Sequence, residues 1–294
     1  MNRILVGIVV AVFSASVITG ESQDLNVHYF GQTDSDVVSS TPYGNNSEAG
    51  RFVKSDDALI YYETYGSGEP VVVLHGGGVG CVYEMGRFID ELRKEYLVIA
   101  PSTRGQGKSE IGVRPITYEQ KANDITAAIN ATTDKPVTIL GFSDGAYTAY
   151  KIASMYPDRV KKVIAIGAGE NIPSLRKIPL SSLEQLAKID SRFIKEKIAL
   201  CPEPEKLQDF LDRYYTFFNQ ELISKELFGS IQCPVLVLAG ELDRNAPLDT
   251  VINAYKMIPR AQLAIIANGE HPVFIKNFDA VWISVKQFLD EKSE

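Results

Sequence analysis

Short apolar runs recur along the chain from residue 71 onward, and segments with helical spacing separate them. The runs cover residues 71–74, 96–100, 137–140, 163–166, 235–238 and 263–266. The intervening segments, which place apolar residues three or four positions apart, are 82–94, 118–131, 146–156, 248–258 and 279–289. Runs that are apolar throughout indicate strands buried on both faces of a sheet. Their alternation with helices predicts an α/β fold with a doubly wound, mostly parallel central sheet.

Two parts of the chain from residue 51 onward depart from this alternation. Segments 51–53 and 58–64 are rich in strand-forming residues and lie close together, so we expect an antiparallel starting pair. Segment 170–230 has helical stretches and no convincing strand, which predicts a helical cap inserted after the sixth strand. An insertion there lies over the carboxyl ends of the strands, where α/β proteins bind ligands. We therefore expect the active site to have a lid.

The first 50 residues differ in composition from the rest. Asn2 and Arg3 precede an apolar run at 4–13 and then small residues up to Gly20, which is the pattern of a signal peptide over residues 1–20. The run is shorter than the roughly 20 residues that cross a bilayer, so we expect cleavage rather than stable membrane insertion. Residues 21–50 are polar and predict an arm or linker before the domain at 51–294. The mature protein should be exported, to a periplasm or outside the cell.

Composition and charge narrow the class of protein. A chain of 294 residues with 45% hydrophobic and 23% charged residues is typical of a globular protein, and a net charge of −7 argues against a nucleic-acid partner. The only cysteines are Cys81, Cys201 and Cys233. Three cysteines predict no disulfide framework, although a Cys201–Cys233 bridge and buried free thiols both stay open. Without CxxC or HExxH motifs, we expect no metal and no cofactor.

The strongest chemical signal is the pentapeptide Gly141-Phe142-Ser143-Asp144-Gly145 at a predicted strand-to-helix junction. Small residues on both sides of a serine allow a sharp turn that presents the hydroxyl at the carboxyl end of the strand. A lone Gly-x-Ser-x-Gly motif is weak, but its place between strand and helix makes Ser143 a candidate nucleophile. The alternative is an incidental turn.

A glycine-rich stretch follows the run at 71–74. In His75-Gly76-Gly77-Gly78 a backbone N–H group can approach a ligand without obstruction by side chains. We predict that the N–H groups of Gly77 and Asp144 form an oxyanion hole, in which each donor contributes roughly 3 kcal/mol to an acyl-transfer reaction. The alternative is a tight turn, and we expect His75 to order the loop rather than transfer protons.

A serine hydroxyl needs a neighbouring base, and the chain has three histidines, His28, His75 and His271. His28 lies in the polar arm and His75 in the glycine-rich loop. His271 follows the last predicted strand in a turn-like stretch and is therefore the predicted base.

The base needs a carboxylate that fixes its tautomer, and Asp243 is the predicted acid because it directly follows the strand at 235–238. The order serine, acid, histidine is that of the hydrolases with this elbow. Glu170, Glu241 and Asp249 remain rival acids.

In combination these motifs resemble the α/β-hydrolase superfamily, specifically its capped, signal-bearing, esterase-like members, from about residue 51 to the C-terminus. The motifs are His75-Gly76, the stretch 104–109, the elbow at Ser143, Asp243 and His271. Ser102 departs from the pattern, because many relatives have an acid two positions before the arginine. Serine at the elbow also differs from the aspartate of epoxide hydrolases and haloalkane dehalogenases.

The resemblance implies acyl transfer to water through an acyl-enzyme on Ser143. We expect a carboxylesterase acting on a small-molecule ester, without a cofactor. The triad does not distinguish this reaction from those of an acyltransferase, an iminopeptidase or a carbon–carbon bond hydrolase, and a non-catalytic ligand-binding homologue is a further alternative. The cap aromatics at 210, 214, 215, 217 and 218 are expected mainly to pack in a core, and the alternative is that they line an apolar acyl pocket. The sequence leaves the substrate and the oligomeric state open.

Overall fold

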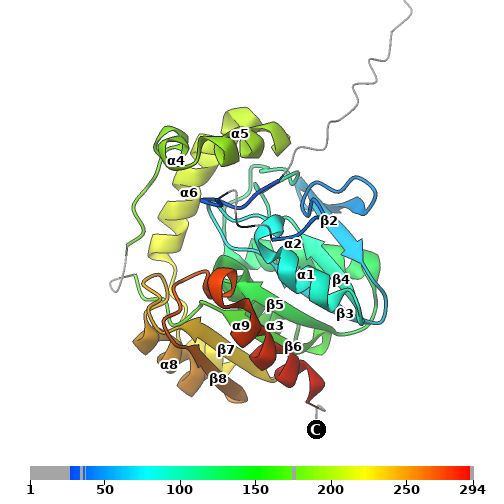
Figure 1. The fold of residues 1–294 in the computed structure, drawn as a ribbon, viewed down its shortest axis with the longest axis vertical. Helices are drawn as coiled ribbons and strands as arrows, with labels where there is room; N and C mark the ends of the chain where they lie inside the picture. Colours follow the sequence, from blue (N-terminus) through cyan, green and yellow to red (C-terminus); the bar gives the residue numbers. More distant parts are fainter. Residues whose placement is uncertain (1–26, 34–35, 37, 174–176, 292–294) are drawn as a thin grey trace, which may run out of the picture.

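A computed structural model describes residues 27–33, 36, 38–173 and 177–291 of the chain. One eight-stranded sheet forms its centre, in the order β1-β2-β4-β3-β5-β6-β7-β8 (Figure 1). The strands are β1 (Gly50–Ser55), β2 (Ala58–Tyr65), β3 (Glu69–Leu74), β4 (Tyr96–Pro101), β5 (Val137–Phe142), β6 (Val160–Ile166), β7 (Val235–Gly240) and β8 (Ala261–Ile266). β1 and β2 pair antiparallel, β2 joins β4 antiparallel, and all other neighbours are parallel. The predicted fold class, including the antiparallel starting pair, is confirmed.

Helices cover both faces of the sheet. α1 (Gly86–Leu92) and α9 (Val273–Asp290) lie on one face, where they pack against Val71 and Val73 of β3 (Figure 1). On the other face α2 (Tyr118–Thr132), α3 (Asp144–Met155) and α8 (Leu248–Met257) pack against Val72 and Leu74. Successive side chains of a strand point to opposite faces, so a strand that is apolar throughout contributes to both cores.

Two helices differ from their predicted bounds. The segment expected to be a helix over 82–94 is a short 3-10 helix, η1 (Val82–Met85), followed by α1. The last helix begins at Val273 rather than 279, because a kink at Asn277 joins a short first part to the predicted part. Neither difference moves the apolar face, since Phe274 and Phe278 both contact Phe88 of α1.

A group of helices lies between β6 and β7, where the cap is expected. They are α4 (Leu183–Ile189), α5 (Ser191–Leu200), η3 (Pro204–Lys206), α6 (Leu207–Gln220) and α7 (Lys225–Gly229). α4, α5 and α6 stand above the sheet in Figure 1 and share an apolar core that includes Phe193, Leu207 and Phe210. The expected signal peptide lies outside the described residues, and the division of the chain into signal, arm and capped domain stays a prediction.

The described part of the polar arm packs against the domain. Tyr43 is completely buried, and its hydroxyl donates to Asp90 of α1 at 2.7 Å. His28 is also buried. A polar composition therefore does not mean that this segment is solvated.

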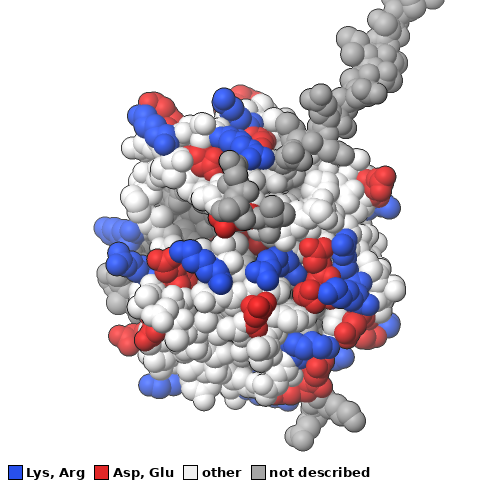
Figure 2. Space-filling view, in the orientation of Figure 1, with Lys and Arg blue, Asp and Glu red and all other residues white. Residues whose placement is uncertain are grey.

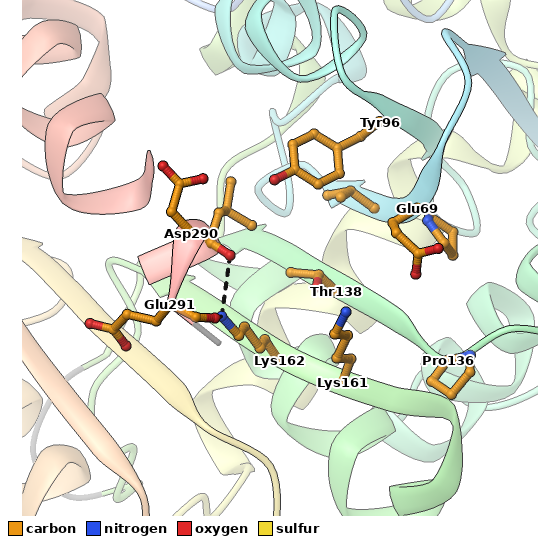
Figure 3. Close-up of a pocket in the computed structure, with 11 residues that line it drawn as sticks. Glu69, Tyr96, Pro136, Thr138, Lys161, Lys162, Asp290 and Glu291 are labelled. Carbon is orange, nitrogen blue, oxygen red and sulfur yellow. Dashed lines mark hydrogen bonds between the residues drawn. The ribbon is translucent and has the colours of Figure 1, made fainter. Parts of the chain in front are cut away.

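At the amino end of the sheet a pocket of about 540 Å³ lies beside the end of α9 (Figure 3). There Lys162 of β6 donates to the carbonyl oxygens of Phe288 at 2.7 Å and Glu291 at 2.6 Å. The ammonium group thus satisfies carbonyls that have no partner within a helix end. On the face shown in Figure 2, acidic and basic side chains are interspersed. No helix within the described ranges is long and apolar enough to cross a membrane.

Arg104, in the loop after β4, joins three parts of the fold. Its guanidinium donates to both oxygens of Asp124 in α2, at 2.8 and 2.9 Å, and to Asp57 in the β1–β2 turn at 2.7 Å. Arg104 and Asp124 are almost completely buried. Removing one member of such a cluster leaves uncompensated charge in a low dielectric.

We expect Arg104→Met to lower the free energy of unfolding by about 3–5 kcal/mol, because Asp124 then loses its buried partner. Arg114→Met is the matched control: Arg114 is half exposed, pairs with Asp56 at the surface, and should change stability by less than about 1 kcal/mol. Denaturant unfolding of both variants measures the difference. Equal losses in the two variants would show that the buried cluster has no special role.

Candidate active site

Ser143 stands at the sharp turn between β5 and α3. Its backbone has φ 51°, in the left-handed region, and its N–H donates to the carbonyl of Ile166 at 2.7 Å. A Cβ atom on Gly141 would lie 2.5 Å from the carbonyl oxygen of Gly145, and one on Gly145 would lie 2.6 Å from that of His75. Both glycines are therefore required by close backbone approach, as the motif predicts.

Ser143, His271 and Asp243 form a continuous hydrogen-bonded chain. The Oγ of Ser143 lies 2.9 Å from His271 Nε2. His271 Nδ1 lies 2.8 and 3.0 Å from the two carboxylate oxygens of Asp243. With Nδ1 donating to the carboxylate, Nε2 is free to accept the serine proton.

The carboxylate of Asp243 is fixed as well as buried. Only 4% of Asp243 is exposed, and its Oδ1 accepts the backbone N–H groups of Asn245 at 2.8 Å and Ala246 at 2.7 Å. The strand β7 delivers Asp243 to the carboxyl end of the sheet, and the loop after β8 delivers His271. Ser143, Asp243 and His271 thus follow three different strands and meet at the carboxyl edge of the sheet.

The structure separates Asp243 from its rivals. Glu241 is exposed and accepts the N–H of Asn268. Glu170 accepts from Ser224 and Asn253, and Asp249 lies in the first turn of α8. Of these four acids, Asp243 alone has a hydrogen bond to His271 among the described residues.

The other two histidines have different partners. His75 Nδ1 donates to the carbonyl of Gly76 at 2.6 Å, and its Nε2 accepts the N–H of Thr103 at 3.1 Å. Burial lowers the pKa of His75 to about 4, so the ring is neutral and orders the loop. His28 bonds to Glu196 and lies near Asp190 in the cap.

Gly77 lies beside the first residue of α3. A Cβ atom on Gly77 would lie 2.8 Å from the Cβ of Asp144. In the described part of the chain, neither the Gly77 nor the Asp144 N–H donates to a protein acceptor. Two neighbouring unused donors next to Ser143 are what an oxyanion site requires, and the role itself stays a prediction.

The glycine-rich loop is held by polar side chains from three elements. Glu84 of η1 accepts the N–H of Gly76 at 2.6 Å. Gln106, from the loop after β4, donates to the carbonyl of Gly78 at 3.1 Å and accepts a hydrogen bond from Lys197 of α5. The stretch 104–109 thus connects the cap to this loop.

A buried ion pair adjoins the elbow. Lys121 of α2 donates to both carboxylate oxygens of Asp144, each at 2.7 Å, and the hydroxyl of Tyr118 donates to the same group at 3.1 Å. The Lys121 ammonium also lies 4.7 Å from the ring centre of Tyr214 in α6. The side chain of Asp144 is therefore committed to this pair, which leaves its backbone N–H for another partner.

A cavity of about 800 Å³ contains the Ser143 and His271 side chains. Its apolar wall includes Phe142, Phe274, Ile178, Tyr214, Tyr215 and Phe218. Three of the five cap aromatics thus line the cavity, although all three are also largely buried. Phe210 instead packs in the core of the cap, as expected for most of the set.

Sequence reasoning missed one glycine, Gly167, that lies against His271 and Asp243. Gly167 follows β6 with φ 67°, and a Cβ atom there would lie 3.1 Å from His271 Cε1 and 3.4 Å from Asp243 Oδ2. The sequence signal for a close packing contact at Gly167 is its position directly after an apolar run. Sequence reasoning also missed Tyr29 and Phe30 of the arm, which line the cavity and which no periodicity marks.

The cysteines and acids suggest no further chemistry. Cys81, Cys201 and Cys233 are all free thiols, so no Cys201–Cys233 bridge is formed. Within the residues that the structure places, no group of three or more His, Cys, Asp or Glu side chains is arranged to hold a metal ion.

Comparisons with known proteins agree with the fold. The family model for the alpha/beta hydrolase fold matches residues 69–200. The serine hydrolase BPHL of Homo sapiens is 26% identical over 241 residues, which is 78% of this chain and 82% of that protein. The 2-hydroxy-6-oxo-6-phenylhexa-2,4-dienoate hydrolase of Comamonas testosteroni is 28% identical over 265 residues, 78% of this chain and 91% of that one.

Among solved structures, a serine hydrolase involved in carbazole degradation superposes with a TM-score of 0.69 at 22% identity, covering 82% of this chain and 98% of that one. These relatives are hydrolases and point to a hydrolase here. The sheet order, the elbow and the matched family model together show that the chain has the α/β-hydrolase fold.

Proposed function

We propose that this protein is a serine hydrolase that cleaves a carboxylic ester, or a related acyl bond, of a small molecule through an acyl-enzyme on Ser143. The observation that carries the proposal is the continuous chain Ser143–His271–Asp243, with 2.9 and 2.8 Å between the successive groups. The cavity around Ser143 is large enough for a medium-sized substrate.

In the first step the Oγ of Ser143 attacks the substrate carbonyl, and His271 Nε2 takes the serine proton. The imidazolium that forms is stabilised by the buried Asp243 carboxylate. The carbonyl oxygen becomes an oxyanion, which the N–H groups of Gly77 and Asp144 stabilise. When the tetrahedral intermediate collapses, the bond to the leaving group breaks and the leaving oxygen takes the proton from His271.

In the second step a water molecule attacks the acyl-enzyme, and His271 again accepts and returns a proton. The acid product leaves, and the Ser143 hydroxyl is regenerated. No electron acceptor or cofactor is needed for this sequence.

Carbon–carbon bond hydrolysis is a second candidate, and the observation that favours it is the 28% identity to the Comamonas testosteroni dienoate hydrolase. The same triad would attack a ketone, and a carbon atom rather than an oxygen would leave and be protonated. The aromatic residues of the cavity wall suit a phenyl-bearing substrate of either kind.

A fluorophosphonate probe tests the nucleophile directly. We expect the wild type to be labelled and Ser143→Ala to be neither labelled nor active, with kcat reduced by at least about 1,000-fold, because no other hydroxyl among the described residues is paired with His271. Activity is measured on acyl esters of increasing chain length and on the phenyl-bearing dienoate.

The relative kcat/KM of esters and dienoate decides between the two candidate reactions. Unchanged circular dichroism of Ser143→Ala shows that the variant is folded. Labelling and turnover that survive this substitution would contradict the triad assignment.

The assignment of Asp243 as the acid can be tested against a neighbouring carboxylate, Glu241. We expect Asp243→Asn to lower kcat by about 1,000- to 10,000-fold, because the amide no longer fixes the required His271 tautomer. Glu241→Gln, two residues away at the surface, should leave kcat within about twofold. Steady-state kinetics of the two variants are compared at the same pH, and a large loss in the Glu241 variant instead would reassign the acid.

We further propose that the protein is exported and that residues 1–20 are removed. The support is the short basic start, the apolar run at 4–13 and the small residues that follow. Expression of the full chain in a bacterial host, followed by N-terminal sequencing of the periplasmic and secreted fractions, should find a start near residue 21. A full-length chain retained in the cytoplasm would exclude export in that host.

A further inference from the structure

The start of the described chain lies against the active-site cavity. Tyr29, Phe30 and Gly31 line the same cavity of about 800 Å³ as Ser143 and His271. In Figure 1 this dark blue segment runs beside α6 and below α5. A stretch with the composition of a linker is therefore part of the site's wall.

The segment is fixed to the cap by directed contacts. His28 is 3% exposed, and its Nδ1 lies 2.7 Å from the carboxylate of Glu196 in α5. The N–H of Gly31 donates at 2.9 Å to Asp190, the residue between α4 and α5. Asp190 also lies 3.4 Å from His28 Nε2, so one carboxylate holds two residues of the segment.

Apolar and loop contacts fix the segment further. The ring of Phe30 packs edge-on against Phe193 of α5 with 5.4 Å between centroids. The thiol of Cys81, just before η1, donates to the carbonyl of His28 at 3.7 Å. Contacts to both the cap and the main domain order the residues on either side of Tyr29.

The walls of the cavity show which ligand chemistry it suits. The cavity is lined by Tyr29 and Phe30 of this segment and by Tyr214, Tyr215 and Phe218 of α6. Aromatic side chains contribute large apolar area and favourable stacked or edge-on contacts with another ring. A flat, aryl-bearing group gains more from such walls than a short alkyl group does.

We propose that residues 28–31 form a substrate-binding wall, in which Tyr29 and Phe30 contact an aryl group of the substrate remote from the scissile carbonyl and His28 is a positioning residue. This inference rests on the proposed hydrolase function and specifies the substrate class of the same site. It assigns specificity to a segment that lies outside the sheet, the cap and the family motifs.

The test compares two esters of the same alcohol, p-nitrophenyl acetate and p-nitrophenyl 4-phenylbutanoate, in the protein from residue 21 onward. We expect Phe30→Ala to lower the ratio of kcat/KM for the phenylbutanoate over the acetate by about 10-fold, mainly through KM of the aryl ester. His28→Ala should lower the ratio in the same direction, because it releases the segment. Phe52→Ala, an exposed aromatic of β1 that does not line the cavity, should leave the ratio unchanged.

The outcomes are distinguishable from those that test the triad. If wild type and variants are labelled by the fluorophosphonate but all ratios are equal, the arm is not a specificity wall and this inference fails alone. If Phe30→Ala lowers kcat/KM for both esters equally, its role is structural and the inference is again overturned. If the wild type is not labelled at all, the proposed function itself fails.

Discussion

The backbone turn at Ser143 is the constraint on which the rest of the site depends. A non-glycine residue with φ near 51° costs about 1–3 kcal/mol and persists only where its surroundings enforce it. The sheet enforces it through the hydrogen bond to Ile166, and α3 does so by starting at the next residue. Gly141 and Gly145 allow the backbones to approach closely enough for this. The strained turn is stable because a large buried core holds both of its ends.

The same turn buries the carboxylate of Asp144, and the ammonium group of Lys121 compensates its charge. Asp144 is almost completely buried one residue after Ser143, and an uncompensated carboxylate there would repel any negative charge beside it and carry a large desolvation cost. The bidentate contact with Lys121 and the bond from Tyr118 neutralise it. The pair also orients Asp144, the first residue of α3. The contact with Lys121 therefore helps to hold the backbone N–H group of Asp144 in place.

The sequence predicted those features that depend on local pattern. Continuous apolar runs identify strands of a parallel sheet, and the parallel arrangement brings residues that follow each strand to one edge, which is why Ser143, Asp243 and His271 were found together. Local pattern does not distinguish Asp243 from Glu241, since what separates them is the burial of Asp243 and its hydrogen bonds to His271, Asn245 and Ala246. Tyr29 and Phe30 were missed because contacts across more than 150 residues, such as His28 to Glu196, leave no local periodicity.

The supports of the glycine-rich loop are buried groups whose pKa values are shifted. Burial raises the pKa of Glu84 to about 8 and lowers the pKa of Lys197 to about 8. Glu84 holds Gly76 directly, and Lys197 acts on Gly78 through Gln106. Both supports therefore hold the backbone of the glycine-rich loop beside Ser143 through hydrogen bonds in a site where burial disfavours their charged forms.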